Sequence, residues 1–528
     1  MLPKTVFTDH GVPFFPLGAQ SHNSSGYSEA ELRPFWDVCE KLPLNSVAIP
    51  IAWERIEPVE GQFDLEIVKS IISACRERNL KLILPWFGTW KNGHMKYVPQ
   101  WVKCDRERFP RVVAANGAEL PNLSAMSVQA RDADKRAFCR MMETIRDFDR
   151  EEQTVIAVQV ENELGIIGQA IRDHSPAAQA AYAADVPPEL LARLEKAEET
   201  EFVVRAWRDA GAKTGGSWES LFGNYAPEAF TAYHMAKYIE DIARAGKQIY
   251  DVPMYTNAWL DGQGFDTPGV SYPSGGVVMK NIAIWKWFAP SLDMLCPDIY
   301  AASGASYREI ATAYSRDDNP LFVPETGFTL PSCLWMFRAI EENALTGIHF
   351  FGAESIADGK GGVRSEALPI VDNYQALSAV LPLLTRLRGT GKIHAVVQEE
   401  FMHVQRLRLD GYQAIAQFGE FERGGDFRHM VANEPIRRGR GLVIQTGPKE
   451  LVVCGMGFTL KVRPLPQLGQ VLPEQVDAQP EHHMEYPLVE EGRFDSGGKF
   501  CVERVRNGDQ TDFGIYVYPD CAVRVVLP

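Results

Sequence analysis

The chain lacks the features that would place it in a membrane or on a nucleic acid. No apolar run approaches the roughly 18 residues that a membrane-spanning helix needs. The N-terminus has no basic segment followed by an apolar one, as a secretory signal peptide would, so we expect a cytoplasmic protein. The 69 acidic residues outnumber the 54 lysines and arginines, and the net charge of −15 argues against nucleic acids and anionic membranes as partners.

Cysteine and histidine are too scattered to indicate a disulfide framework or a metal site. The nine cysteines are odd in number and include no CxxC pair. His22, His94 and His349 lack the spacing of zinc ligands, and the Gly-Lys-Gly-Gly segment at 359–362 does not have the spacing of a phosphate loop. We therefore expect free, mostly buried thiols in a reducing compartment, and neither a metal nor another cofactor.

The sequence does contain a regular alternation of short apolar runs and helical patterns. Eight apolar runs lie before about residue 375, and most end in polar or aromatic residues: 12–19, 46–53, 80–86, 154–161, 251–257, 292–300, 320–325 and 344–353. Alternation of this kind is typical of parallel strands joined by helical crossovers, and eight units favour a closed (β/α)8 TIM barrel, an α/β fold. We expect the long insertion at about 169–248 to be helical and to wall the mouth of the barrel.

The pattern changes after residue 382. Short strand-like runs follow, separated by Gly, Asp and Pro: 396–409, 412–418, 440–453, 458–462, 499–505 and 513–527. This spacing predicts a β-sandwich. We therefore expect a TIM-barrel catalytic domain over 1–382 and a smaller C-terminal β-sandwich domain over 383–528. The second domain has few paired aromatic residues, so we expect it to cover the barrel or to form a homodimer contact rather than to bind sugars.

Two glutamates stand at the ends of buried strands of the predicted barrel. The strand from Thr154 leads into Asn162 and Glu163, and the run from Pro320 ends at Glu325. Barrel enzymes place their chemistry at the carboxyl ends of the strands, so both carboxyl groups are expected at one mouth. Cleavage of a glycosidic bond needs one carboxyl group as proton donor and one as nucleophile or base. A structural ion pair, or a solvated position in a loop, is the alternative role for each glutamate.

Other residues near the strand ends are candidates for binding a sugar. Asn162 could hold a 2-hydroxyl group, and Tyr300 could hydrogen-bond Glu325 and keep it oriented. A turn residue and a core tyrosine are the alternative roles of these two. The further candidates for stacking or hydroxyl contacts are Asn23, Trp53, Trp86, Asn257 and Trp259. A single tryptophan is more often simply packed in a core, but several at one predicted face favour a platform for a sugar.

The residues around the first glutamate resemble a known family. Gln159-Val-Glu-Asn-Glu163, followed by Gly165, is similar to the acid/base signature of glycoside hydrolase family 35 β-galactosidases. The resemblance covers most of residues 10–375, and the stretch from Pro85 to Trp101 is closer to family 42. It implies that Glu163 is the acid/base and Glu325 the nucleophile, with Asn162 and Tyr300 beside them.

The sequence also departs from that family pattern. Leu164 stands where the family usually has tyrosine, Glu54 stands where it has asparagine, and the zinc-binding cysteines of many family 42 enzymes are missing. These departures bear on the pocket that binds the substrate more than on the mechanism.

The resemblance implies a retaining exo-β-galactosidase that removes terminal non-reducing galactose from oligosaccharides by double displacement. Two alternatives remain open: a retaining β-glycosidase for another sugar, such as a β-glucosaminide or a β-xyloside, and a non-catalytic sugar-binding barrel. The presence of both glutamates argues against the second alternative.

Overall fold

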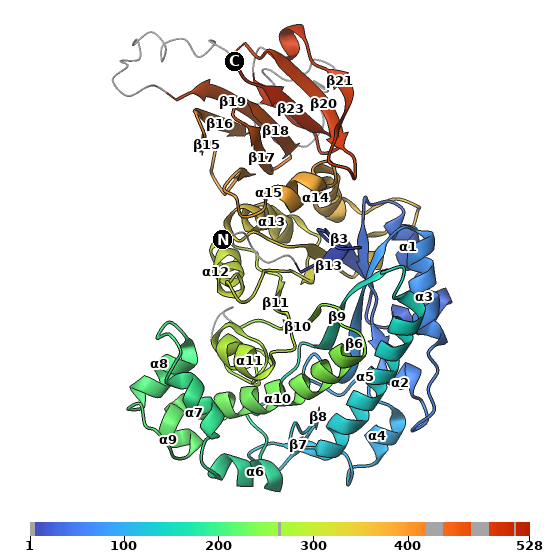
Figure 1. Cartoon of the computed structure of the whole chain (residues 1–528), viewed down its shortest axis with the longest axis vertical. Helices are drawn as coiled ribbons and strands as arrows, with labels where there is room; N and C mark the ends of the chain where they lie inside the picture. The colour runs from blue at the N-terminus through green and yellow to red at the C-terminus, as the bar shows by residue number, and fades with distance from the viewer. Residues whose placement is uncertain (1–5, 262–265, 419–436, 466–484, 512–513) are drawn as a thin grey trace.

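The computed structural model describes residues 6–261, 266–418, 437–465, 485–511 and 514–528. Within them, parallel strands close into a barrel (Figure 1). These strands are β3 (Leu17–Gln20), β4 (Ser46–Ala48) with β5 (Ile51–Ala52), β6 (Lys81–Lys91), β9 (Val155–Asn162), β10 (Met254–Ala258), β11 (Met294–Ile299), β12 (Glu325–Thr326) and β13 (Ile348–Phe351). The hydrogen-bonded order is β12-β11-β10-β9-β6-β4-β3-β13.

The barrel closes between its seventh and eighth strand segments. Val323, just before β12, pairs in parallel with Ile348 of β13, and the backbone N–H of His349 donates to the Val323 carbonyl at 2.9 Å. The predicted (β/α)8 TIM barrel is therefore confirmed. The interior near the amino ends of the strands is apolar, and Phe7 of the N-terminal segment packs edge-on against Phe322 there.

Amphipathic helices cover the outside of the barrel because their apolar residues recur on one face. The main ones are α1 (Glu29–Cys39), α3 (Glu66–Glu77), α5 (Val128–Asp149), α10 (Ala226–Ile249), α11 (Ile282–Phe288), α12 (Gly304–Tyr314), α13 (Leu330–Glu342), α14 (Leu368–Ser378) and α15 (Leu381–Leu387). In α5, for example, the hydroxyl of Ser127 caps the first turn by accepting from the N–H of Ala130 at 3.1 Å. None of the helices in the described part is both long and apolar enough to cross a membrane.

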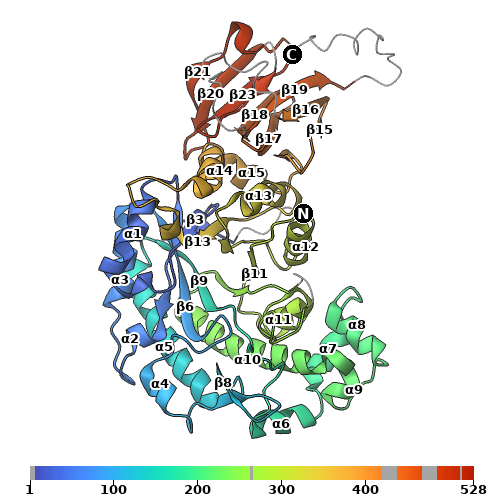
Figure 2. The ribbon, with the colours of Figure 1, turned by 180° about the vertical axis from the view of Figure 1, so that it is seen from behind.

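The insertion after β9 is helical, as predicted. It contains α6 (Pro176–Ala183), α7 (Pro188–Leu194), α8 (Phe202–Asp209) and α9 (Trp218–Phe222), followed by the long helix α10. Figures 1 and 2 show α6 to α9 at the end of the molecule opposite the C-terminal sheets.

Two antiparallel sheets follow the barrel. One has the order β14-β17-β18-β23-β20-β21 and the other β15-β16-β19-β22. The strands are β14 (Ile393–Val397), β15 (Val404–Leu409), β16 (Tyr412–Phe418), β17 (Arg440–Gly447), β18 (Glu450–Met456), β19 (Phe458–Pro464), β20 (Leu488–Phe494), β21 (Phe500–Val505), β22 (Ile515–Tyr516) and β23 (Ala522–Val526). Buried apolar residues from both sheets form one cluster, which confirms the sandwich.

Two details of the predicted sandwich differ from the structure. The runs 396–409 and 440–453 each contain a turn that divides them between two strands, and β20 was not predicted. Residue 513, where another predicted run begins, lies outside the described residues. The nine cysteines all lie within the described part and are all free.

Candidate active site

A cavity of about 490 Å³ opens at the carboxyl ends of the barrel strands. Its lining comes from the ends of seven different strands or from the segments that follow them, so distant parts of the sequence meet there. The lining residues are Asn23, Lys91, Asn92, Glu163, Trp259, Leu260, Asp266, Ser271, Asp298, Tyr300, Glu325 and Phe351. Both glutamates predicted to be catalytic are among them, as are Asn23, Trp259 and Tyr300.

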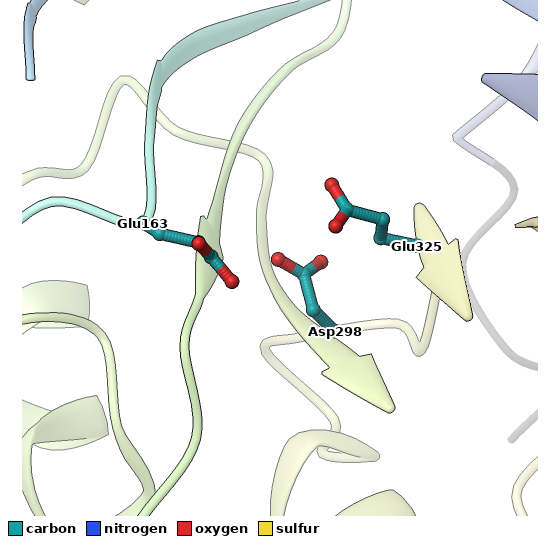
Figure 3. Close-up of side chains that lie close together, drawn as sticks. All are labelled: Glu163, Asp298 and Glu325. Atoms are coloured by element: carbon teal, nitrogen blue, oxygen red, sulfur yellow. The ribbon is translucent and has the colours of Figure 1, made fainter. Parts of the chain in front are cut away.

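Three carboxyl groups converge in this cavity. Glu163 follows β9, Asp298 lies in β11 and Glu325 begins β12, and Figure 3 shows their carboxyl groups facing one another. One oxygen of each lies within 4.8 Å of an oxygen of the other two. Two unit charges at that separation repel by roughly 3–4 kcal/mol at an effective dielectric constant of about 20, so the three groups cannot all be ionised without a large cost.

Glu163 has the environment of a proton donor. Its carboxyl group is buried, and burial together with the charge of Glu325 raises the pKa of Glu163 to about 7, although Lys91 acts in the opposite direction. The side-chain amide of Asn92 donates to Glu163 Oε2. The backbone N–H of Glu163 donates to Asn257 Oδ1 at 3.0 Å, and this contact fixes the start of its side chain.

Glu325 is held by two neutral donors. The hydroxyl of Tyr300 donates to Glu325 Oε1 at 2.8 Å, which is the contact expected from the sequence, and the amide of Gln20 donates to Oε2 at 3.2 Å. These two hydrogen bonds fix the orientation of the Glu325 carboxyl group opposite Glu163.

A bulge in β6 brings Asn92 and Lys91 to the cavity. Trp86 pairs with Val160 of β9, and Lys91 pairs with Asn162. Between these two pairs the chain moves on by five residues in β6 but by only two in β9. The chain just after the bulge is also hydrogen-bonded to the backbone of Glu163: the N–H of Gly93 donates to the Glu163 carbonyl at 2.9 Å.

Two further buried carboxyl groups, those of Glu161 and Asp134, accept hydrogen bonds from residues of this bulge. Glu161 accepts the backbone N–H groups of Thr89 (2.9 Å) and Trp90 (2.7 Å). Asp134 of α5 accepts the hydroxyl of Thr89 at 2.6 Å and the indole N–H of Trp86 at 2.8 Å. Burial, followed by the proximity of Asp134, raises the pKa of Glu161 well above its usual range.

Several residues predicted to bind the substrate lie elsewhere. Trp53 and Trp86 are fully buried and do not line the cavity; their indole N–H groups donate to Glu57 and Asp134. Strand-end position alone did not reveal that these indoles have buried carboxyl partners. Asn257 is also behind the cavity wall, where it orients Glu163 and Asp298.

Asn162 is fully buried, and neither side-chain amide atom has a hydrogen-bond partner among the described residues. It does not line the cavity, so its contact with a sugar hydroxyl stays a prediction. The insertion at 169–248 likewise contributes no lining residue among those described. Part of the wall is supplied instead by four residues that follow β10, namely Trp259, Leu260, Asp266 and Ser271.

Sequence reasoning missed Asp298 and Lys91 as site residues. A signal for Asp298 was present, because it precedes Tyr300 by two positions and residues two apart along a strand share a face. Lys91 gave no such signal, since its place depends on the bulge. The carboxyl groups of Glu163, Asp298 and Glu325 form the group in the described part that could together hold a metal ion.

One family model matches the part of the chain that contains Glu163. Residues 27–207 match the family model of glycoside hydrolase family 42, described as "Beta-galactosidase". The chain therefore carries a glycoside hydrolase domain. The matched model is that of family 42, rather than family 35, to which the sequence around Glu163 is similar. Residues 370–518 match a domain of unknown function, DUF5597. None of the curated proteins matches the chain.

Solved structures of glycosidases are among those similar to this chain. A β-galactosidase from the psychrophilic Marinomonas ef1 is 12% identical with a TM-score of 0.47, covering 70% of this chain and 61% of its own. A catalytic mutant of a family 42 β-galactosidase from G. stearothermophilus is 14% identical with a TM-score of 0.49, covering 72% and 59%. An exo-β-1,4-mannosidase from Opitutaceae bacterium strain TAV5 is 15% identical with a TM-score of 0.43, covering 71% and 62%. The chain spans about 60% of the length of these β-galactosidases.

Proposed function

We propose that the chain is a retaining exo-β-galactosidase in which Glu163 is the acid/base and Glu325 the nucleophile. The observation that carries this proposal is the pair of carboxyl groups facing one another across one cavity, with oxygen atoms within 4.8 Å. Retaining glycosidases separate their carboxyl groups by about 5–5.5 Å, whereas inverting enzymes need about 6.5–9.5 Å to admit a water molecule. The short separation supports direct attack by Glu325.

The first step is the transfer of the sugar to Glu325. Glu163 gives its proton to the glycosidic oxygen while a Glu325 oxygen attacks the anomeric carbon, so the bond to the leaving group breaks as the ester bond forms. Tyr300 and Gln20 orient the attacking carboxylate through hydrogen bonds of 2.8 and 3.2 Å.

The second step releases the sugar to water. Glu163, now a carboxylate, takes a proton from a water molecule whose oxygen attacks the anomeric carbon, and the ester bond to Glu325 breaks. A pKa near 7 suits Glu163 to both steps, because it can give and regain a proton at neutral pH.

Galactose is the sugar proposed for the cavity. The family model that matches residues 27–207 is described as a β-galactosidase. The cavity volume of about 490 Å³ lies in the range of about 300–1,000 Å³ that is usual for small-ligand pockets, which supports an enzyme acting on terminal sugars. Trp259 lines the cavity and offers an indole face for stacking.

The C-terminal sheets are proposed to have a structural role. Arg440 of β17 donates to Asn373 of α14 at 2.5 Å, and the N–H of Ala395 in β14 donates to Glu341 of α13 at 3.0 Å. Apolar residues of the first sheet belong to the same buried cluster as the barrel helices. The boundary at residue 382 stays a prediction, and it falls inside α15.

A panel of aryl β-glycosides with NMR of the released sugar tests this function. We expect β-galactoside to be the best substrate and the first product to be the β-anomer. A preference for β-glucosaminide or β-xyloside would change the sugar and keep the mechanism. An α-anomer as first product, or no turnover of any glycoside, would overturn the proposal.

Glu325→Gly provides a second test of the same mechanism. The variant should lose hydrolysis, and azide should restore cleavage of activated galactosides by attacking from the vacated position, with the glycosyl azide as product. Undiminished hydrolysis by the variant without azide would contradict the assignment of Glu325.

A further inference from the structure

We propose that Asp298 is a positioning residue for the acid/base, and that its carboxyl group keeps its proton throughout the reaction and donates a hydrogen bond to Glu163 whenever Glu163 is ionised. The inference rests on the proposed function and adds to it a role for the third carboxyl group of the cavity. No proton leaves Asp298 in either step.

The neighbouring amide fixes the orientation of Asp298. Asn257 Oδ1 accepts the backbone N–H of Glu163 (3.0 Å) and the amide of Gln159 (3.1 Å), so its Nδ2 must be the atom that faces Asp298. That Nδ2 donates to Asp298 Oδ2 at 2.6 Å. Asp298 Oδ2 is therefore an acceptor, and the proton of this carboxyl group belongs on Oδ1.

Asp298 Oδ1 is the atom that remains for Glu163. It is buried, and no donor among the described residues reaches it. Asp298 lines the cavity, and its carboxyl group lies within 4.8 Å of those of Glu163 and Glu325. A buried oxygen that has no donor, in a carboxyl group that lies beside two others, is stabilised when it carries a proton and donates it in a hydrogen bond.

The charges around Asp298 agree with a neutral carboxyl group. Burial, the charge of Glu325 and the charge of Glu163 together raise the pKa of Asp298 well above its usual range, and Lys91 opposes them. A charge on Asp298 would also raise the pKa of two neighbouring tyrosines, Tyr255 and Tyr300. Of the three carboxyl groups, Glu325 must be ionised for attack and Glu163 must change its state, so Asp298 is the one left to remain neutral.

This assignment gives Asp298 its effect after the first step. Protonation of the leaving group turns Glu163 into a carboxylate inside a buried cavity that already contains the sugar ester. A hydrogen bond from Asp298 stabilises that carboxylate and orients it toward the incoming water. When Glu163 regains its proton from water, the bond is no longer needed.

Two substitutions separate a neutral donor from an ionised carboxylate. Asp298→Asn keeps the shape and a donor, so we expect kcat/KM within about tenfold of the wild type and an unchanged alkaline limb of the pH profile. Asp298→Leu removes the donor. We expect this variant to lower kcat at least 100-fold on a dinitrophenyl galactoside, for which hydrolysis of the glycosyl-enzyme is the slow step. We also expect the alkaline limb of its pH profile to move to higher pH, because Glu163 loses a hydrogen bond that favours its ionised form.

Asp261→Asn is a matched control. Asp261 is buried and its pKa is raised to about 6 by burial, yet it does not line the cavity, so this variant should leave the pH profile unchanged. If Asp298→Asn abolishes activity as completely as Glu325→Gly, an ionised Asp298 is required and the proposal is overturned. Loss of activity in a chelator with recovery on adding a divalent cation would overturn it as well, because the three carboxylates would then be ligands.

An infrared difference spectrum tests the proton without any turnover. The wild type minus Asp298→Asn should show the carbonyl band of a protonated carboxyl group at pH 7, and the same band should be absent from the difference made with Asp261→Asn. A carboxylate band in its place would disprove the inference whatever the substrate. Failure of the double displacement is recognised separately, by an inverted product or by an active Glu325→Gly.

Discussion

Glu161 and Glu163 stand two residues apart at the end of one strand, yet their carboxyl groups serve different regions. Glu161 lies among the backbone N–H groups of the β6 bulge and beside Asp134 of α5. Glu163 faces the cavity, with a side-chain donor in Asn92 and the carboxyl groups of Asp298 and Glu325 opposite. Burial raises the pKa of both.

The difference shows that a raised pKa alone does not identify a catalytic acid. Both oxygens of Glu161 are used by the backbone, so its carboxyl group has no access to a substrate. Glu163 has an oxygen left for the cavity, together with an ionisable partner in Glu325. The Glu161 pair supports the bulge, and the bulge in turn supplies the donor that holds Glu163.

The largest expected effect is on catalysis. Glu163→Gln should lower kcat/KM for substrates with poor leaving groups by about 10³-fold, since a positioned general acid contributes about 10²–10⁴-fold. Substrates with good leaving groups should lose much less in the first step. Steady-state kinetics over a leaving-group series measures this, and an equal loss for all leaving groups would refute proton donation by Glu163.

The main expected effect of replacing Glu161 is a loss of stability. Glu161→Ala leaves the buried N–H of Trp90 without its acceptor, whereas the N–H of Thr89 keeps a second acceptor in Asp134 Oδ2 at 3.0 Å. A buried unsatisfied group costs about 1–3 kcal/mol, so urea denaturation should show a decrease of about 1–3 kcal/mol in the free energy of unfolding. Glu161→Gln, which retains one acceptor oxygen, is the matched control and should lose less. An unchanged free energy of unfolding in Glu161→Ala would show that the bulge does not depend on this side chain.

The pKa of Glu163 predicts how stability depends on pH. The folded protein holds this proton up to about pH 7, whereas an unfolded glutamate loses it near pH 4.5. Between these values the folded state binds more protons, so the free energy of unfolding should fall as pH rises, by up to about 3 kcal/mol. Denaturation of Glu163→Gln at several pH values should show a shallower slope, and identical slopes for both proteins would contradict the shift.

Lys91 should have the smallest effect. Its charge lowers the pKa of Glu163, so Lys91→Met should move the alkaline limb of kcat/KM to higher pH, by about one pH unit or less. A pH profile on one aryl galactoside measures the displacement. Movement of the limb to lower pH would mean that Lys91 is not the favourable neighbour of the Glu163 carboxylate.

Much of the fold could be read from the sequence because buried parallel strands form short apolar runs between helical patterns. The same logic located Glu163 and Glu325, since strand ends meet at one mouth. It also located Tyr300, which donates to Glu325, but not Asp298 or Lys91. On a regular strand Glu161 and Glu163 would share a face, but both have left-handed backbones, with φ of 62° and 43°.

The roles of Trp86 and Lys91 show the same limit. The bulge between them contains Gly88, where a Cβ atom would collide with the Glu161 and Asp134 carboxyl groups. A glycine does not by itself fix the length of the bulge, which is built through contacts with Glu161 and Asp134 from other elements. Trp86 was therefore predicted at the sugar platform and lies instead against α5, bonded to Asp134. Asp298, by contrast, could have been found from its spacing to Tyr300.

Trapping the glycosyl-enzyme tests the central assignment most directly, because three carboxyl groups compete for the role of nucleophile. A 2-deoxy-2-fluoro-galactoside with a good leaving group should inactivate the protein and add one fluorosugar per chain. Peptide mapping by mass spectrometry should place that sugar on Glu325. A label on Asp298 or Glu163, or no covalent label while the enzyme turns over galactosides, would contradict the account.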